Sequence, residues 1–264
     1  MKIGKVELYI HETLERKGAM LFSLIDPVDF KSEDLAIKTA KEMAKGGADI
    51  VLLGGSTGAQ GELLDNVALK IKEVIDIPLV LFPGNIATIS KHSDAIYFMS
   101  LLNARNPYWI TQAQMLAAPI IKAYNIEPLP VGYIVIHPGG TVGWVGDANF
   151  VPREKPKIAA ALAIAGEFLG NRFIITDTGS NPSLQNSGPV PKEMIRAVRS
   201  VTTVPYIVAG GIMTGEQLKD AYSSGADAIQ VGTAFQDPSQ SYKKIALFSK
   251  ITKEEGLKKK KTSR

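Results

Sequence analysis

The stretch Val204-Pro-Tyr-Ile-Val-Ala-Gly-Gly-Ile-Met-Thr214 decides the fold, together with the similar stretch Ala226-Asp-Ala-Ile-Gln-Val-Gly-Thr-Ala234. Each is a short apolar run that ends in glycine, a pattern typical of a strand buried on both faces. Residues 215–225 between them have a helical composition and end on a glycine that suits a helix C-cap. The two stretches therefore predict a strand–helix–strand unit of a parallel sheet.

Glycines stand at the carboxyl ends of both predicted strands, at Gly210–Gly211 and at Gly232–Thr233. In a (β/α)8 barrel the last two strands often hold a phosphate at this position. Glycine suits that task because it has no Cβ to keep the backbone away from a ligand. A tight turn without a ligand is the other interpretation of the same residues.

The rest of the chain repeats this unit. Six further apolar runs predict strands, and they alternate with helical segments, as expected for parallel strands with right-handed crossovers. We predict an α/β fold, a single (β/α)8 (TIM) barrel over 1–264 with a poorly formed third helix at 86–92; an open doubly wound sheet is the alternative. The six strands are expected at 19–25, 49–53, 78–82, 95–101, 131–136 and 172–176, and the main helices at 7–17, 32–45, 63–75, 108–124, 156–169, 191–201 and 239–255.

Length and charge agree with this prediction. The 264 residues fit one barrel, for which about 250 residues is typical, although two small domains would also fit. Much of the net charge of +4 lies in the tail 258–264. A basic tail can bind anionic lipid or nucleic acid, but usually it is a solvated end, and we expect it to be disordered.

Composition excludes several classes of function. The chain has no cysteine, which rules out disulfides and thiolate chemistry, and its three histidines are scattered, which argues against a zinc site. No apolar run approaches a membrane span and no signal-peptide pattern is present, so we expect a cytoplasmic protein. Nucleic-acid-binding and nucleotide-binding motifs are also missing, and no nucleic acid partner is expected.

Asp26 and Ser56 follow the first two predicted strands. In a barrel they would be neighbours at one mouth, because the carboxyl ends of all strands meet there. A carboxylate and a hydroxyl suit Mg²⁺, which prefers oxygen ligands and bridges to substrate phosphates. Taken alone, the Asp26-Pro27 pair is more typical of a turn than of a metal ligand, and the pairing with Ser56 makes the two interpretations about equal.

Asp177 is the acidic residue at the end of predicted strand 6, followed by the small polar run Thr178-Gly-Ser-Asn181. It could act as a base or accept a hydrogen bond from a substrate hydroxyl. The other interpretation is a loop aspartate that caps backbone N–H groups. The sequence itself leaves these two roles open.

Two aromatic segments lie near the predicted mouth. The glycine-rich stretch 137–147 carries Trp144 and is expected to be a mobile loop. The block 101–110 joins strand 4 to an apolar helix start, and it suggests a subunit interface, an apolar-ligand wall or plain packing. We expect a homo-oligomer on the strength of this block.

The chain resembles the geranylgeranylglyceryl phosphate synthase family and the related bacterial prenylglyceryl phosphate synthases. The resemblance covers nearly the full length, and its most specific parts are the blocks 100–109 and 138–146. It is carried by Leu24-Ile-Asp-Pro27, Leu53-Gly-Gly-Ser-Thr-Gly58, Leu81-Phe-Pro-Gly-Asn85, Ser100-Leu-Leu-Asn-Ala-Arg-Asn-Pro-Tyr-Trp109, Pro138-Gly-Gly-Thr-Val-Gly-Trp-Val-Gly146 and Val208-Ala-Gly-Gly-Ile212.

This resemblance implies a prenyltransferase that joins geranylgeranyl diphosphate to the 3-hydroxyl of sn-glycerol 1-phosphate, the first ether-bond step of archaeal-type membrane phospholipid biosynthesis. It implies Mg²⁺ held by Asp26 and Ser56, and Asp177, where the family usually has glutamate, as the residue that holds the hydroxyl. The glycerol phosphate site would comprise Ile175, Thr176, Asp177, Thr178, Gly179, Ser180, Asn181, Gly210, Gly211, Gly232 and Thr233.

Two other hypotheses remain open at this point. The glycine pairs alone would also allow an isomerase or cyclase that acts on a sugar phosphate. A barrel without turnover that binds phosphate is the third possibility. A long apolar groove beside the anion site would favour the prenyltransferase, whereas a closed polar pocket would favour the isomerase.

Overall fold

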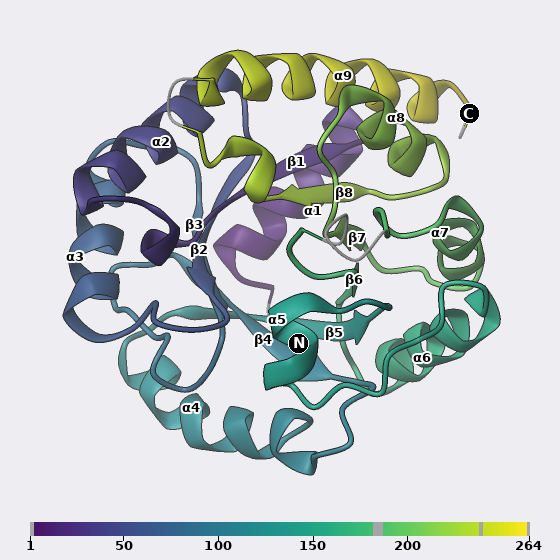
Figure 1. The fold of residues 1–264 in the computed structure, drawn as a ribbon, viewed down its shortest axis with the longest axis horizontal. Coiled ribbons are helices and arrows are strands. Elements are labelled where there is room, and N and C mark those ends of the chain that lie inside the picture. The colour runs from purple at the N-terminus through teal and green to yellow at the C-terminus, as the bar shows by residue number, and fades with distance from the viewer. Residues whose placement is uncertain (1–2, 182–186, 238–239, 263–264) are drawn as a thin grey trace.

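The computed structural model describes residues 3–181, 187–237 and 240–262. Eight parallel strands form a closed barrel in sequence order, and β8 returns to pair with β1. A ring of helices surrounds the barrel (Figure 1), and the predicted TIM barrel is confirmed. The strands are β1 (Met20–Ile25), β2 (Ile50–Gly55), β3 (Leu79–Pro83), β4 (Ala95–Leu101), β5 (Glu127–Val135), β6 (Phe173–Asp177), β7 (Tyr206–Ala209) and β8 (Ala228–Val231).

The helices follow the predicted alternation, with one addition at the barrel mouth. They are α1 (Lys5–Lys17), α2 (Glu33–Gly46), α3 (Gly61–Lys72), α4 (Gln112–Ala123), α5 (Gly140–Val145), α6 (Pro156–Phe168), α7 (Lys192–Arg199), α8 (Gly215–Ser223) and α9 (Ser241–Thr262).

The apolar runs form strands because both of their faces are covered. In β8, Ile229 and Val231 pack into the layer beneath the helices, whereas Ala228 faces the barrel interior. Gln230 follows the same alternation as Ala228 and is therefore on the inward side. A mainly apolar run can bury both of its faces in this way.

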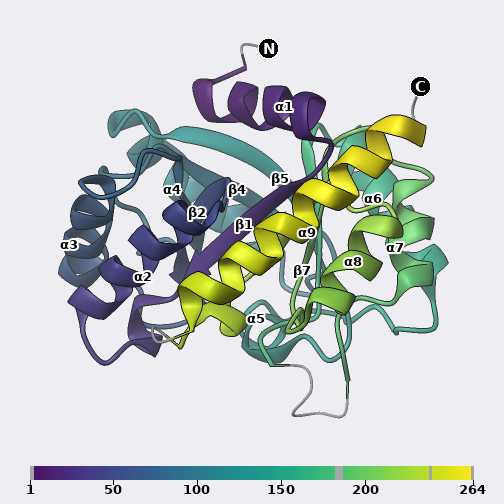
Figure 2. The same ribbon diagram turned by 90° about the horizontal axis from the view of Figure 1, so that it is seen from above.

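Helix α1 lies across the amino-terminal end of the barrel, and α5 lies at the opposite end (Figure 2). The Glu127 carboxylate accepts hydrogen bonds from the backbone N–H groups of Val6 and Glu7, at 2.8 and 2.9 Å. The buried Glu7 carboxylate in turn accepts two hydrogen bonds from Arg172, at 2.5 and 2.7 Å. These contacts fix α1 on this end of the barrel.

The segment between β3 and β4 contains turns and bends but no helix over 84–94. The sequence predicted a poorly formed third helix at 86–92, and the structure has no helix there at all. Thr88 and Ser90 of this segment are nevertheless buried. The segment therefore covers part of the barrel wall without the width of a helix.

Strand β5 begins at Glu127, four residues before its predicted start. Its first residues include Pro128 and Pro130, which have no N–H to donate to a ladder. Residues 127–130 pair with β4, whereas pairing with β6 begins at Val131. The prolines are thus tolerated where one side of the strand is unpaired.

The basic tail is helical where we expected disorder, so that prediction is wrong for residues 258–262. Helix α9 continues to Thr262, because Lys259 forms an ion pair with Asp227 and Lys260 donates to the Arg16 carbonyl at 2.9 Å. Residues 263–264 and residue 239, the predicted start of the closing helix, lie outside the described residues. None of the described helices is both long and apolar enough to span a membrane.

Candidate active site

Two adjoining cavities open at the carboxyl-terminal mouth of the barrel. One, the polar chamber, is lined mainly by residues that follow β1, β6, β7 and β8. The other, the apolar groove, runs along the ends of β3 and β4 toward α4. They share Gly55, Ser56, Phe82, Tyr133 and Val142, so the two cavities adjoin along these five residues.

The polar chamber brings together most of the predicted site residues, which come from segments far apart in the chain. Those that line it are Asp26, Ser56, Asp177, Gly179, Ser180, Asn181, Gly210, Gly211, Gly232 and Thr233.

Three predicted site residues do not line the chamber. Ile175 is a fully buried residue of β6. Thr176 lies beside it, and its hydroxyl shares a 2.7 Å hydrogen bond with the Tyr206 hydroxyl. Thr178 is also buried, and its Oγ1 has no hydrogen-bond partner among the described residues. These three residues are buried beside the chamber and are absent from its lining.

Asp177 lies at the bottom of the chamber with 6% of its surface exposed. The Tyr133 hydroxyl donates to its Oδ2 at 2.5 Å, and the Gly179 N–H donates to its Oδ1 at 2.6 Å. Burial raises the pKa of Asp177, because it penalises the charged form, and the two hydrogen bonds lower it in part. A carboxylate with a raised pKa is a better proton acceptor.

Gly210 lies directly against this carboxylate. Its φ of +84° is in the left-handed region, and a Cβ there would be 2.5 Å from Asp177 Oδ1 and 2.6 Å from Thr178 Oγ1. Only glycine fits both the backbone conformation and the space. We attributed this glycine to a phosphate, but it is equally required by the position of Asp177.

Asp26 lines the same chamber as Asp177 and follows β1. Burial and the neighbouring Asp29 raise the pKa of Asp26 to about 7, although a hydrogen bond from the Val28 N–H opposes this. A Cβ on Gly55 would lie 2.1 Å from Asp26 Oδ2, so the strand end of β2 approaches this carboxylate closely. Asp26 is therefore a half-buried carboxylate beside a second acid, which is a setting that favours a metal ion.

The protein offers few metal-ligating side chains around Asp26. Across the residues that the structure describes, no group of three or more His, Cys, Asp or Glu side chains could enclose a metal ion. Asp26 and Ser56 both line the chamber, so the protein offers one carboxylate and one hydroxyl. This set suits Mg²⁺, which keeps several waters and completes its shell with substrate phosphates.

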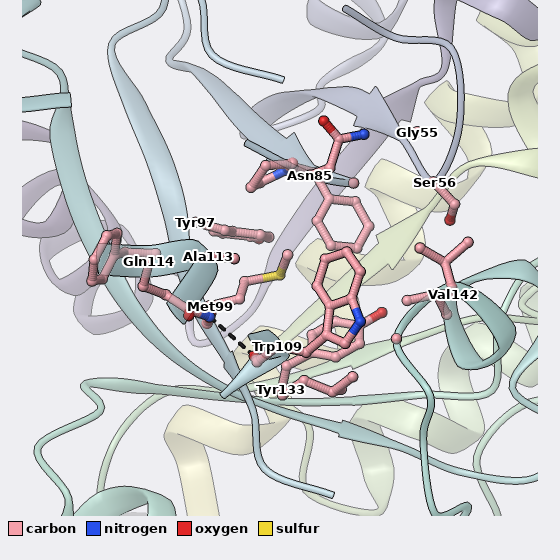
Figure 3. A pocket seen from close by; sticks show the side chains of 17 residues that line it. Gly55, Ser56, Asn85, Tyr97, Met99, Trp109, Ala113, Gln114, Tyr133 and Val142 are labelled. Atoms are coloured by element: carbon pink, nitrogen blue, oxygen red, sulfur yellow. Dashed lines mark hydrogen bonds between the residues drawn. The ribbon is translucent and has the colours of Figure 1, made fainter. Parts of the chain in front are cut away.

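The apolar groove is walled by aromatic and aliphatic side chains (Figure 3). Phe82 lines it, with ring centroids 5.7 Å from Tyr97 and 5.9 Å from Tyr133. Trp109 and Met99 also line it, and Gln114 donates to the Trp109 carbonyl at 3.1 Å. Of the three interpretations of the block 101–110, the structure therefore favours the apolar-ligand wall for Trp109.

The glycine-rich segment 137–147, expected to be a mobile loop, contains the short helix α5. Gly143 packs against the Phe150 ring, where a Cβ would lie 2.2 Å from the nearest ring atom. Val142 and Val145 line the groove, whereas Trp144 is 88% exposed and lines neither cavity. The segment thus forms one wall of the site.

Sequence reasoning missed two residues of the site, Tyr133 and Gln230. Tyr133 lies in an apolar strand, where an aromatic side chain is usually core. Gln230 lines the chamber and is 4% exposed. A polar amide inside a run as apolar as β8 was the signal that could have identified it.

The model of the PcrB family matches residues 12–249. The chain is 53% identical to the geranylgeranylglyceryl phosphate synthase of Pyrococcus horikoshii, over 89% of this chain and 91% of the relative. It is 45% identical to the synthase of Methanosphaera stadtmanae, over 91% of this chain and 96% of the relative. The family match includes every segment that lines the two cavities.

Solved structures give the same result. The chain superposes on the (S)-3-O-geranylgeranylglyceryl phosphate synthase of Thermoplasma acidophilum in complex with sn-glycerol-1-phosphate, with a TM-score of 0.88 and 32% identity. That match covers 96% of this chain and 100% of the other. A likeness to the N-acetylmannosamine-6-phosphate 2-epimerase of Clostridium perfringens, with a TM-score of 0.57 and 16% identity, shows the fold alone. The chain belongs to the PcrB family, within which its relatives are geranylgeranylglyceryl phosphate synthases.

Proposed function

We propose that this protein transfers the geranylgeranyl group of geranylgeranyl diphosphate to the 3-hydroxyl of sn-glycerol 1-phosphate and forms an ether. The observation that supports this best is that the polar chamber and the apolar groove adjoin and share five lining residues. Such a pair of cavities fits two substrates that meet end to end. One is small and charged, and the other is long and apolar.

Asp177 is the group that would handle the acceptor hydroxyl. The C1–oxygen bond of the diphosphate breaks and its electron pair leaves with pyrophosphate, while the acceptor oxygen bonds to C1 and loses its proton. The raised pKa of Asp177 makes its carboxylate a suitable proton acceptor. Tyr133 and the Gly179 N–H hold this carboxylate in one orientation.

Asp26 and Ser56 would hold Mg²⁺ at the junction of the two cavities. When bound there, the metal ion would supply charge stabilisation for the leaving pyrophosphate. Asp26 supports this role because its carboxylate is half-buried and has Asp29 as its neighbour, so a cation offsets an unfavourable charge. Ser56 supports it because it lines both cavities.

The sugar-phosphate isomerase or cyclase is less well supported. It requires a closed polar pocket, whereas the polar chamber opens into a groove lined by Phe82, Trp109 and Met99. The third hypothesis, a barrel without turnover, requires an active site whose proposed base is missing or not held in place. Asp177 is instead held by two hydrogen bonds.

The cytoplasmic location and the homo-oligomer stay predictions. The block 101–110 gives the oligomer less support than we expected, because Asn103 is buried and Trp109 lines the groove. Exposed apolar side chains on α4, namely Met115, Leu116 and Ile120, offer a better surface for it.

The function is tested by incubating the purified protein with geranylgeranyl diphosphate, sn-glycerol 1-phosphate and Mg²⁺ and measuring ether product. Asp26→Asn should reduce transfer more than 100-fold, because it removes the one carboxylate of the metal site. Asp76→Asn, the same change on an exposed residue at the other end of the barrel, is the control. Full activity of Asp26→Asn would show that Asp26 does not hold the metal ion. If the wild-type protein forms no ether product, the proposed function is wrong.

A further inference from the structure

Gln230 carries a buried polar atom that the function described above leaves unexplained. Its side chain lines the polar chamber, and its Oε1 finds no hydrogen-bond donor in the part of the chain that the structure describes. Buried polar atoms in folded proteins nearly always have a partner, so an exception calls for a specific explanation. An amide held ready for a ligand is such an explanation.

The strand register places Gln230 in the same row as Asp177. Asp177 of β6 pairs with Ala209 of β7, and Ala209 pairs with Gln230 of β8. Neighbouring strands are about 4.8 Å apart, so the backbones of Asp177 and Gln230 are separated by about 10 Å. The small Ala209 between them leaves room for a molecule of a few atoms that both side chains can reach.

This row lies deeper than the glycines of the predicted phosphate grip. Gly210 and Gly211 follow Ala209, and Gly232 comes two residues after Gln230. One or two residues of strand correspond to about 3–7 Å toward the mouth. A phosphate held by the glycines would therefore direct its carbon chain down toward Asp177 and Gln230.

sn-Glycerol 1-phosphate has two hydroxyls below its phosphate. The primary hydroxyl is the one that reacts, at Asp177, which leaves the secondary hydroxyl without a partner. We propose that the Gln230 carboxamide forms a hydrogen bond with this secondary hydroxyl and so selects the glycerol backbone of the acceptor. The inference rests on the proposed function for the identity of the acceptor.

Gln230→Met tests this role, because methionine is unbranched and of similar length but has no amide. The two acceptors to compare are sn-glycerol 1-phosphate and 3-hydroxypropyl phosphate, which lacks only the secondary hydroxyl. We expect the wild-type protein to prefer the first by about 10-fold or more in kcat/KM, and the variant to lose that preference. The KM for geranylgeranyl diphosphate should not change.

Gln114→Met is the matched control, since it makes the same change in the apolar groove. It should keep the preference between the two acceptors, whatever it does to the prenyl donor. If Gln230→Met weakens both acceptors equally, or acts on the prenyl donor, the proposal is wrong.

The stability of the ligand-free protein separates a ligand-binding amide from a structural one. Removal of a buried amide whose Oε1 has no partner among the described residues should leave the Tm unchanged or raise it. A lower Tm would mean that the amide is satisfied within the protein, which overturns the proposal. If Gln230→Met does not fold, Gln230→Asn withdraws the amide by one methylene group and should also lose the preference.

Calorimetric titration of each acceptor into the protein without prenyl donor keeps this test separate from the test of the reaction. A wild-type protein that binds sn-glycerol 1-phosphate more tightly than 3-hydroxypropyl phosphate, with the difference lost in Gln230→Met, supports the inference even if no transfer is seen. Equal binding of both acceptors by the wild-type protein overturns it even if transfer is fast.

Discussion

The hydroxyl of Tyr133 donates a hydrogen bond of 2.5 Å to Oδ2 of Asp177. The two residues come from adjacent strands, β5 and β6, where Tyr133 pairs with Ile175 two positions before Asp177. Tyr133 also lines both cavities. One side chain thus contacts the proposed base, the acceptor site and the wall of the prenyl groove.

Tyr133→Phe should shift the pH dependence of turnover. The Tyr133 hydrogen bond lowers the pKa of Asp177 against the effect of burial, so its loss raises that pKa further. Because the proposed base acts when ionised, the acidic limb of the pH–kcat profile should move to higher pH, with kcat at neutral pH reduced about 10-fold or more. Steady-state kinetics over a series of pH values measures both effects.

Tyr97→Phe is the control for this variant. It removes the same atom from the same groove, and the Tyr97 hydroxyl has no hydrogen-bond partner among the described residues. Its acidic limb should stay in place. If both variants shift alike, the pH profile reports on the groove and not on Asp177.

Asp177 should make the protein less stable as the pH rises. Its folded pKa is above the ordinary value of 3.8, so the unfolded chain releases this proton first. Stability is therefore highest below the ordinary pKa and falls as the pH rises through the raised one. The loss is about 1.4 kcal/mol for each pH unit that separates the folded pKa from the unfolded pKa. Asp177→Asn removes this contribution.

Urea unfolding at pH 4.5 and pH 7.5 measures the effect. The free energy of unfolding of Asp177→Asn, relative to the wild-type protein, should be larger at pH 7.5. A difference that does not depend on pH would show that Asp177 has an ordinary pKa. The same variant should lose at least 100-fold in kcat with little change in affinity for the prenyl diphosphate.

Gly210→Ala should reduce both stability and turnover. Its φ of +84° disfavours any Cβ, and this Cβ would also displace the Asp177 carboxylate, 2.5 Å away. The conformational cost alone is about 1–2 kcal/mol. We expect a lower Tm and a kcat reduced more than 10-fold.

Gly170→Ala separates these two effects. Gly170 has a similar φ of +95°, but a Cβ there meets nothing within 4 Å. It should lose about 1 kcal/mol of stability and keep its turnover. Equal kcat values for Gly170→Ala and Gly210→Ala would mean that Asp177 is not displaced.

Lys259→Ala should lower the free energy of unfolding by about 1 kcal/mol, because it leaves a largely buried Asp227 with fewer partners. Arg199 still pairs with Asp227 at 2.6 Å, which limits the loss. Lys261→Ala, an exposed lysine of the same helix, should change almost nothing. Chemical denaturation of both variants compares them, and equal values would support the frayed tail that we first expected.

The sequence was a good guide to the barrel and a weaker one to its irregular parts. The runs that end at Gly210 and Gly232 have a clear pattern, because each strand is apolar on both faces and ends in glycine. Helix α5 was missed because its glycines count against a helix. It forms because Gly143 packs closely on Phe150, a contact that no local pattern reveals.

For the candidate site, too, the sequence indicated some residues and missed others. Asp26 and Asp177 were predicted because each is an acid at the end of a strand, where barrel enzymes place their chemistry, and both line the polar chamber. Tyr133 was missed because an aromatic inside an apolar strand is usually core. Its role depends on the register of β5 against β6, which the sequence of one strand does not contain.

The helix-free segment between β3 and β4 has a consequence for how a long substrate lies. Phe98, which faces outward from β4, lines the apolar groove together with the inward-facing Tyr97 and Met99. The groove therefore crosses the rim of the barrel at β4 and continues outside it, toward α4. A prenyl tail on this path would keep its far end at the protein surface while its diphosphate lies near the polar chamber. We then expect the surface of α4, and not the depth of the barrel, to limit the length of the tail.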